Sequence, residues 1–308
     1  MTSTLHRTSA GAAVVLRAAR RHVWVFECDE KGTRPARRLR VLGGVDLAPG
    51  DLVDLDEKGA VRSRQDRRSV LRRNTGRGEQ VLAANIDDLM VLCAAGMVEG
   101  KEGLIARCIA AARKEGIDVA LVFNKIDIDD DGQLRAEARS WAGLGFDVHS
   151  VSALCGHGLD RLQQRLRGRW AALVGPSGVG KSTLINSLAP GNALRTGELG
   201  AHGRGRHTTS LGQAIPWAGG FLIDLPGVRS FGLFDETSLD AAFPEIMAAS
   251  KDCRFADCVH GPEPGCAVKA AVEKNEIDKE RLASWHRVRE SIRKGREGMT
   301  RPSTHGRE

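Results

Sequence analysis

One segment of this chain, Gly175-Pro-Ser-Gly-Val-Gly-Lys-Ser182, matches the pattern GxxxxGK[ST] and constrains the fold more than any other feature. It follows the apolar run 170–174 and precedes a helical pattern at 183–188, which is the strand–loop–helix context in which the motif binds phosphate. Its glycines let backbone N–H groups converge on phosphate oxygens, and the start of the helix adds a partial positive charge. Lys181 is expected to reach the β- and γ-phosphates, and the Ser182 hydroxyl to ligate Mg²⁺. The residues expected to contact the triphosphate are Gly175, Pro176, Ser177, Gly178, Val179, Gly180, Lys181, Ser182 and Thr183.

Apolar runs of strand length alternate with helical patterns from about residue 80 onward. The runs are 89–93, 119–123, 147–151, 170–174 and 221–223. This alternation predicts an α/β fold with a mostly parallel sheet and helices on both faces. Ligands of such sheets bind at the carboxyl ends of the strands. The motifs described here each come directly after one of these runs, so we expect them to meet at one edge of the sheet.

The tetrapeptide Asn124-Lys-Ile-Asp127 indicates which base the site selects. The Asp127 carboxylate can accept hydrogen bonds from guanine N1–H and the exocyclic amine, whereas adenine has no matching donors and would leave the carboxylate unpaired. Asn124 is expected to hold the motif and the purine edge, and the stem of Lys125 to lie against the ring. The predicted ligand is therefore GTP or GDP.

Two further short motifs fit the same site. Ser152 and Ala153 follow the run 147–151, where a backbone N–H can meet the guanine O6. The four residues from Asp224 to Gly227 fit the pattern DxxG. Asp224 is expected to bind Mg²⁺ through water, and the Gly227 N–H to contact the γ-phosphate. The DxxG segment alone is better explained as a simple turn, and it gains meaning from the other motifs in the same sheet.

The order of these motifs is unusual. Ordinary GTPases run from the P-loop through a switch threonine and DxxG to NKxD and Ser-Ala, whereas here NKxD and Ser-Ala come first. A sheet tolerates this order because each motif lies at its own strand end and binding requires only that the ends converge. The sequence therefore predicts a circularly permuted P-loop GTPase domain whose switch segments lead directly into the C-terminal part of the chain.

The residues before about 75 follow a different pattern. Short apolar runs at 12–16, 23–26, 38–42 and 52–55 are separated by turns, with no helical pattern between them, which predicts a small closed barrel. Eleven arginines lie between residues 34 and 77, and the whole chain carries a net charge of +7. A barrel with a basic face suits nucleic acid, although a solvated basic surface has the same composition.

A cluster of cysteines and one histidine lies in the C-terminal part. Three thiolates and one imidazole within fourteen residues satisfy tetrahedral Zn²⁺ with no open position, which indicates one structural zinc ion. The segment is too small for a core of its own, so the metal is expected to supply folding energy. Helical patterns follow at 268–274 and 278–294. The predicted zinc ligands are Cys253, Cys258, His260 and Cys266.

These motifs together resemble the ribosome small-subunit-dependent GTPase A family (RsgA, also called YjeQ or EngC). The segments Gln80–Asp87 and Gly205-Arg-His207-Thr-Thr209 add to the resemblance, which covers nearly the whole chain. It implies an N-terminal OB-fold β-barrel over residues 1–78, a permuted G domain over 79–238 and a C-terminal α-helical zinc-binding domain over 239–308. It also implies GTP hydrolysis that the small ribosomal subunit stimulates during its late maturation, with rRNA as a partner.

The residue that activates water is less apparent. Many GTPases place a glutamine directly after DxxG, but this chain has Val228 there, so slow intrinsic hydrolysis is expected. His207 is the candidate catalytic residue, and the family resemblance indicates the same position. Thr209 is the first choice for the switch contact with Mg²⁺ and the γ-phosphate, and Thr208 the second.

Other readings remain open from the sequence. Val228 keeps open an RNA-binding scaffold in which GTP binding alone sets affinity and hydrolysis is incidental. The NKxD motif argues against a P-loop kinase, and the barrel and cysteine cluster argue against a related permuted GTPase of the large subunit. No apolar run approaches the roughly 18 residues of a membrane helix, and scattered cysteines suit a reducing compartment. A cytoplasmic monomer without a membrane partner is therefore expected.

Overall fold

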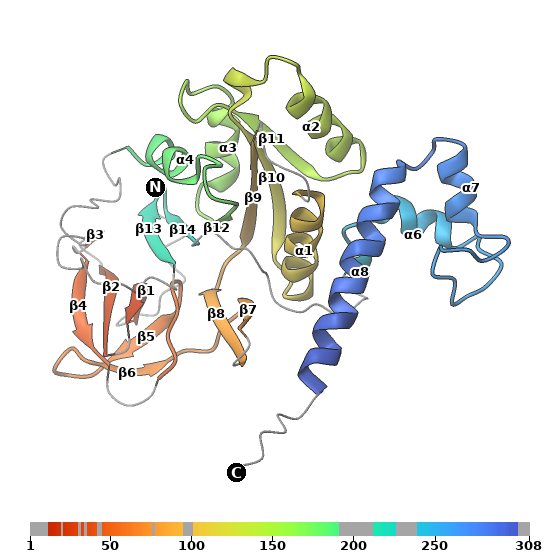
Figure 1. Ribbon diagram of the computed structural model, residues 1–308. Helices are drawn as coiled ribbons and strands as arrows, with labels where there is room; N and C mark the ends of the chain where they lie inside the picture. The colour runs from red at the N-terminus through yellow and green to blue at the C-terminus, as the bar shows by residue number, and fades with distance from the viewer. Residues whose placement is uncertain are drawn as a thin grey trace, which may run out of the picture. The chain divides into compact units, whose positions relative to one another are not determined.

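The computed structural model describes residues 12–19, 21–29, 32–33, 36–41, 45–75, 78–94, 101–190, 212–225 and 239–300 (Figure 1). The chain forms two compact units. Met1–Met97 and Glu115–Ser230 make the first, and Val98–Lys114 and Phe231–Glu308 make the second. The division into domains at residues 78 and 238 stays a prediction.

The first six strands of the first unit form a barrel. They are β1 (Ala12–Ala19), β2 (His22–Asp29), β3 (Gly32–Thr33), β4 (Arg37–Arg40), β5 (Leu52–Leu55) and β6 (Val61–Arg64). They pair in the order β3-β2-β1-β5-β6, and β4 also pairs with β2. A bridge from Val41, directly after β4, to Val61 of β6 closes the barrel. The barrel interior is filled by small branched side chains, among them Val15, Val23 and Val53. The predicted closed barrel is confirmed.

A second sheet follows after a two-stranded antiparallel pair, β7 (Val70–Thr75) and β8 (Gly78–Ala84), which the apolar pattern did not predict. Its strands are β9 (Asp88–Ala94), β10 (Asp118–Asn124), β11 (Asp147–Val151), β12 (Trp170–Val174), β13 (Gln213–Trp217) and β14 (Gly220–Asp224). They lie in the order β11-β10-β9-β12-β14-β13, and all neighbours are parallel except β13 and β14. The predicted parallel sheet is confirmed, with an antiparallel edge strand that the sequence analysis missed.

Amphipathic helices cover this sheet. α2 (Gln133–Gly143) contacts β10 and β11, while α3 (Leu159–Leu166) and α4 (Lys181–Leu188) share one apolar cluster with the sheet. The buried residues of α3 are Leu159, Leu162 and Leu166, at the spacing that places side chains on one face of a helix. Because the strands around β9 are parallel, the loops after β10, β11, β12 and β14 emerge at one edge, where the motifs lie.

The second unit is helical. It contains α1 (Lys101–Lys114), α6 (Pro244–Ser250), α7 (Ala267–Glu273) and α8 (Lys279–Thr300). α1 packs along α8, and a Cβ atom added to Gly103 would lie 3.6 Å from Val288 Cγ2, so the two helices approach closely (Figure 1). α7 and α8 confirm the helices predicted at 268–274 and 278–294. No helix within the described residues is long and apolar enough to cross a membrane.

Candidate nucleotide-binding and zinc sites

The P-loop connects β12 to α4 by a backbone path that requires glycine. Gly178 and Gly180 have φ angles of 80° and 91°, values that L side chains rarely adopt. A Cβ atom at Gly180 would lie 2.4 Å from Asn124 Nδ2, so any other residue would displace that amide. Ser177 and Gly178 are exposed and Val179 is buried, which leaves the loop open on its outer side. Ser182 and Thr183 lie exposed in the first turn of α4.

The side chain of Asn124 joins three of the predicted motifs. Its Nδ2 donates a hydrogen bond to the carbonyl of Val179 in the P-loop at 3.0 Å, and its Oδ1 accepts one from the N–H of Ala153 at 3.0 Å. The side chain is 1% exposed, so both bonds are shielded from water. The Ser187 hydroxyl of α4 donates to the carbonyl of Ala153 at 2.6 Å and braces the same loop. NKxD, Ser-Ala and the P-loop therefore form one connected structure.

Asp127 lies exposed in a one-turn 3₁₀ helix (Ile126–Ile128) at the carboxyl end of β10, after Lys125 in a left-handed conformation. A hydrogen bond from the Ser152 side chain is the main cause that lowers the pKa of Asp127. The Ser152 Oγ also accepts the N–H of Cys155 at 3.1 Å, so its own proton is free to be donated to the carboxylate. Asp127 is therefore ionised at neutral pH and able to accept hydrogen bonds from a guanine edge.

Lys181 of the P-loop forms an ion pair with Asp224 of DxxG. Both side chains are largely shielded from solvent. Asp224 ends β14, and the next residue, Leu225, donates its N–H to the carbonyl of Leu173 on β12 at 3.2 Å. The pairing of β12 with β14 thus brings the phosphate-binding lysine and the predicted magnesium-binding carboxylate together.

The remaining predicted residues of this site lie outside the described part of the chain. They are His207, Thr208, Thr209, Gly227 and Val228. Their roles in switching and in water activation stay predictions.

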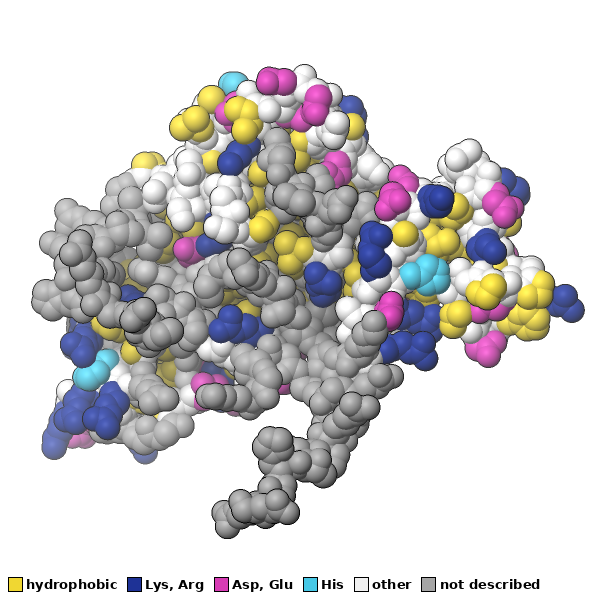
Figure 2. Space-filling model, in the orientation of Figure 1, with side chains coloured by type: hydrophobic (Ala, Val, Ile, Leu, Met, Phe, Trp, Pro, Cys, Tyr) yellow, Lys and Arg dark blue, Asp and Glu magenta, His cyan; other side chains and the backbone are white. Residues whose placement is uncertain are grey.

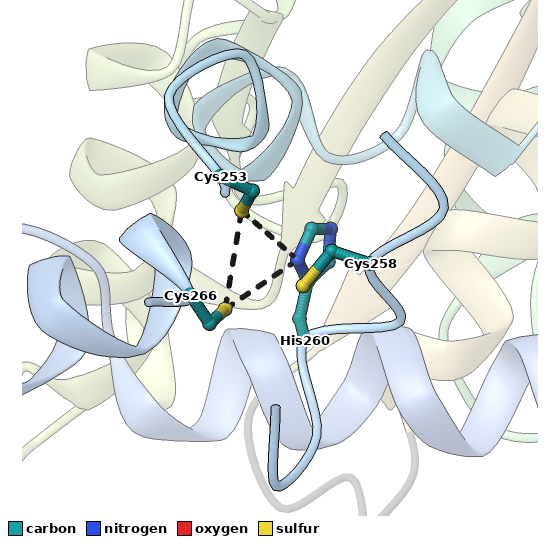
Figure 3. A group of neighbouring side chains, drawn as sticks. All are labelled: Cys253, Cys258, His260 and Cys266. Carbon is teal, nitrogen blue, oxygen red and sulfur yellow. Dashed lines mark hydrogen bonds between the residues drawn. The ribbon is translucent and has the colours of Figure 1, made fainter. Parts of the chain in front are cut away.

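The four predicted zinc ligands converge in the second unit (Figure 3). Their ligand atoms all lie within 4.8 Å of one another. His260 Nδ1 lies 3.7 Å from Cys253 Sγ and 3.7 Å from Cys266 Sγ, and the two sulfur atoms are 4.0 Å apart. Three sulfur atoms and one imidazole nitrogen at this separation fit a closed tetrahedral zinc site. Burial raises the pKa of Cys258 to about 11 in the absence of a cation, which a bound metal ion would reverse.

Residues around the ligands hold the cluster in shape, and the spacing of cysteines did not reveal them. Glu263 accepts hydrogen bonds from the N–H groups of Gly261 at 2.7 Å and Val259 at 3.3 Å, so it closes the loop that carries His260. Cys266 caps the start of α7 by accepting the N–H of Lys269 at 3.5 Å. The sequence signal that could have indicated the role of Glu263 is its position between two ligands, His260 and Cys266.

Comparison with known proteins agrees with this geometry. A family model described as RsgA GTPase matches residues 64–234. A Bacteroides fragilis protein named small ribosomal subunit biogenesis GTPase RsgA is 34% identical over 284 residues, which span 88% of this chain and 92% of that protein. The crystal structure of YjeQ from Thermotoga maritima covers 94% of this chain and 99% of its own, with a TM-score of 0.67 and 26% identity. The crystal structure of YloQ, a circularly permuted GTPase, covers 92% of this chain and 95% of its own, with a TM-score of 0.66 and 22% identity, and shows the same fold.

These matches extend over the permuted motifs that Asn124 and the Lys181–Asp224 pair hold together. The chain belongs to the RsgA GTPase family, and it is a GTP hydrolase with a circularly permuted G domain.

Proposed function

We propose that this GTPase binds the small ribosomal subunit, acts in its late maturation and hydrolyses GTP faster when the subunit is bound. The name of the Bacteroides fragilis relative supports the subunit as partner. Binding of GTP is supported best by the two hydrogen bonds of the Asn124 side chain, because they bring the base-selecting and phosphate-binding segments together.

In this proposal the predicted site residues contact the guanine base, the phosphates or the Mg²⁺ ion. Asp127 accepts hydrogen bonds from the guanine edge, a backbone N–H of the loop after β11 meets O6, and Lys125 packs on the ring. Lys181 and the N–H groups of 175–183 hold the phosphates. Ser182, Thr209 and Asp224 hold Mg²⁺, directly or through water, and the bound ion neutralises charge between the β- and γ-phosphates.

Hydrolysis requires an attacking water, and Val228 has no group to orient it. We assign that role to His207, with Gly227 N–H on the γ-phosphate, and infer that the bound subunit fixes the segment that carries them. The barrel contacts rRNA, and one zinc ion stabilises the C-terminal unit. The protein works as a cytoplasmic monomer, where small subunits mature.

Val228 also favours a second candidate function, an RNA-binding scaffold in which GTP sets affinity and hydrolysis is incidental. Single-turnover hydrolysis of GTP, measured with and without purified small subunits, separates the two. We expect a marked rise in rate with small subunits and none with large subunits. An equal rate in all three samples supports the scaffold, and faster turnover of ATP than of GTP contradicts both.

A further inference from the structure

The exposed face of the barrel carries a row of side chains that the arginine count alone did not distinguish. In the register of the sheet, Arg17 of β1 lies opposite Trp24 of β2, and Trp24 lies opposite Arg38 of β4. The Cζ atoms of Arg17 and Arg38 lie 5.3 Å and 5.7 Å from the centroid of the Trp24 ring. One aromatic ring therefore stands between two guanidinium groups, within range of cation–π attraction.

This row faces away from the barrel core. The residues on either side of Trp24 along β2, Val23 and Val25, are fully buried, and side chains alternate along a strand. Trp24 itself is half-buried and Arg38 is exposed. His22 lies opposite Arg40 in the next row on the same face. Figure 2 shows Lys and Arg side chains gathered at the lower left of the molecule, over the barrel.

Several arginines elsewhere in the first unit have carboxylate partners. Arg37 pairs with Glu27, and Arg67 with the buried Asp51. In the described part of the chain, no carboxylate pairs with the arginines of the row or with Arg40. The pKa of His22 is lowered, first by burial and next by the positive charges of Arg38, Arg40 and Arg21. The positive charge of this face is therefore available to an anionic partner.

We propose that the face formed by Arg17, Trp24, Arg38 and Arg40 binds single-stranded RNA by stacking an unpaired base on the Trp24 ring. The base takes the place of one guanidinium, and the displaced arginine pairs with a phosphate of the same strand. Unpaired bases stack on aromatic side chains, and small barrels of this kind bind the phosphate backbone of a single strand with basic side chains. The inference rests on the proposed function in taking RNA as the partner, and it names the contact surface.

The test uses the full chain and a fluorescein-labelled single-stranded RNA of twelve nucleotides, with binding followed by anisotropy over a series of salt concentrations. Trp24→Leu is expected to weaken binding about tenfold with an unchanged salt dependence, because it removes stacking and no charge. Trp24→Phe should restore most of the affinity. Arg38→Gln is expected to reduce the slope of log K against log salt by about 1.

Arg62→Gln is the matched control, because Arg62 is an exposed arginine on β6 of the same barrel and outside the row. It should lose less affinity than Arg38→Gln. Equal affinity of Trp24→Leu and the unaltered protein overturns the proposal, provided that their thermal unfolding midpoints agree. The proposal is also overturned if a duplex of the same RNA binds the unaltered protein as tightly as the single strand does. Since no ribosomal subunit is present, a failure here is distinct from a failure of subunit-stimulated hydrolysis.

Discussion

The ammonium group of Lys181 pairs with the carboxylate of Asp224 at the carboxyl ends of β12 and β14. Both groups have other partners in the proposed GTP complex, phosphate for the lysine and Mg²⁺ for the aspartate. Nucleotide must therefore separate the pair, and Mg²⁺ makes that separation favourable because it takes the carboxylate while the phosphates take the lysine. We therefore expect this ion pair to couple the binding of nucleotide to the binding of Mg²⁺.

Asp224→Asn tests this link. The variant frees Lys181 from its partner, so binding of GTP without Mg²⁺ is expected to become tighter than in the unaltered protein. With Mg²⁺ the variant should bind about tenfold more weakly than the unaltered protein, because it lacks a charge-assisted contact to the hydrated ion. Titration with a fluorescent GTP analogue, with Mg²⁺ or with EDTA, measures both. Asp160→Asn, an exposed carboxylate on α3, serves as the control. The same Mg²⁺ dependence in Asp224→Asn and the unaltered protein contradicts the link.

Asp127→Asn is expected to weaken GTP binding by about tenfold to a hundredfold, because a neutral amide replaces the charged acceptor of two guanine donors. ATP binding should stay as weak as before, so that the preference for guanine falls. Xanthosine triphosphate should gain, since the amide N–H₂ can donate to its 2-oxo group. Competition of the three nucleotides against one labelled probe gives the ratios. A GTP-to-ATP ratio equal to that of the unaltered protein would mean that Asp127 does not read the base.

The sequence was sufficient to predict the strands that carry these motifs, because buried parallel strands such as 119–123 and 170–174 are continuous apolar runs. β13 was not predicted, because Gln213–Trp217 is short and contains a proline, which argues against a strand in the middle of a sheet and is tolerated at the edge where β13 lies. The hydrogen bonds of Asn124 to Val179 and Ala153 could not be predicted from the sequence either. They join segments 55 and 29 residues away and form only once the sheet is complete. Ligand spacing within one loop, by contrast, predicted the cysteine cluster directly.

Zinc is expected at one ion per chain, and Cys258→Ser should lose it. Because the segment around the ligands has little core of its own, loss of the ion should lower the thermal unfolding midpoint of the second unit. Metal content by atomic emission and unfolding by circular dichroism measure the two effects. Cys155→Ser changes an exposed thiol outside the cluster and should alter neither. Glu263→Gln should weaken zinc binding by about tenfold, since it loosens the loop that carries His260 without removing a ligand. Full zinc content in Cys258→Ser would exclude the proposed site.

His207→Ala is expected to retain GTP binding and to lose the acceleration of hydrolysis by small subunits, because no glutamine follows DxxG to orient water in its place. Single-turnover rates with and without subunits measure the effect. His202→Ala, five residues earlier in the sequence, is the matched control and should keep the acceleration. If both variants respond to subunits like the unaltered protein, His207 has no part in the reaction.

Asn85 offers a test of how the barrel is held to the second sheet. Its Nδ2 donates to the carbonyl of Gly50 at 2.9 Å, and its Oδ1 accepts the N–H of Arg68 at 2.8 Å, while its own backbone adopts a φ of 58°. Because Asn85 is 1% exposed, Asn85→Ala leaves the buried carbonyl of Gly50 and the part-buried N–H of Arg68 unpaired, and the expected loss in free energy of unfolding is about 2–4 kcal/mol.

Asn85→Gly separates the two causes of that loss. It removes the same hydrogen bonds but tolerates positive φ, so it should be less destabilised than Asn85→Ala by about 1 kcal/mol. Urea unfolding followed by circular dichroism gives both values. If Asn85→Gly is as stable as the unaltered protein, the backbone conformation alone accounts for an asparagine here. A large loss in free energy of unfolding in both variants would instead mean that the side-chain hydrogen bonds of Asn85 are what the position requires. Those bonds join Gly50 of the barrel to the segment leading into β9, which would give a physical reason for the asparagine in Gln80–Asp87.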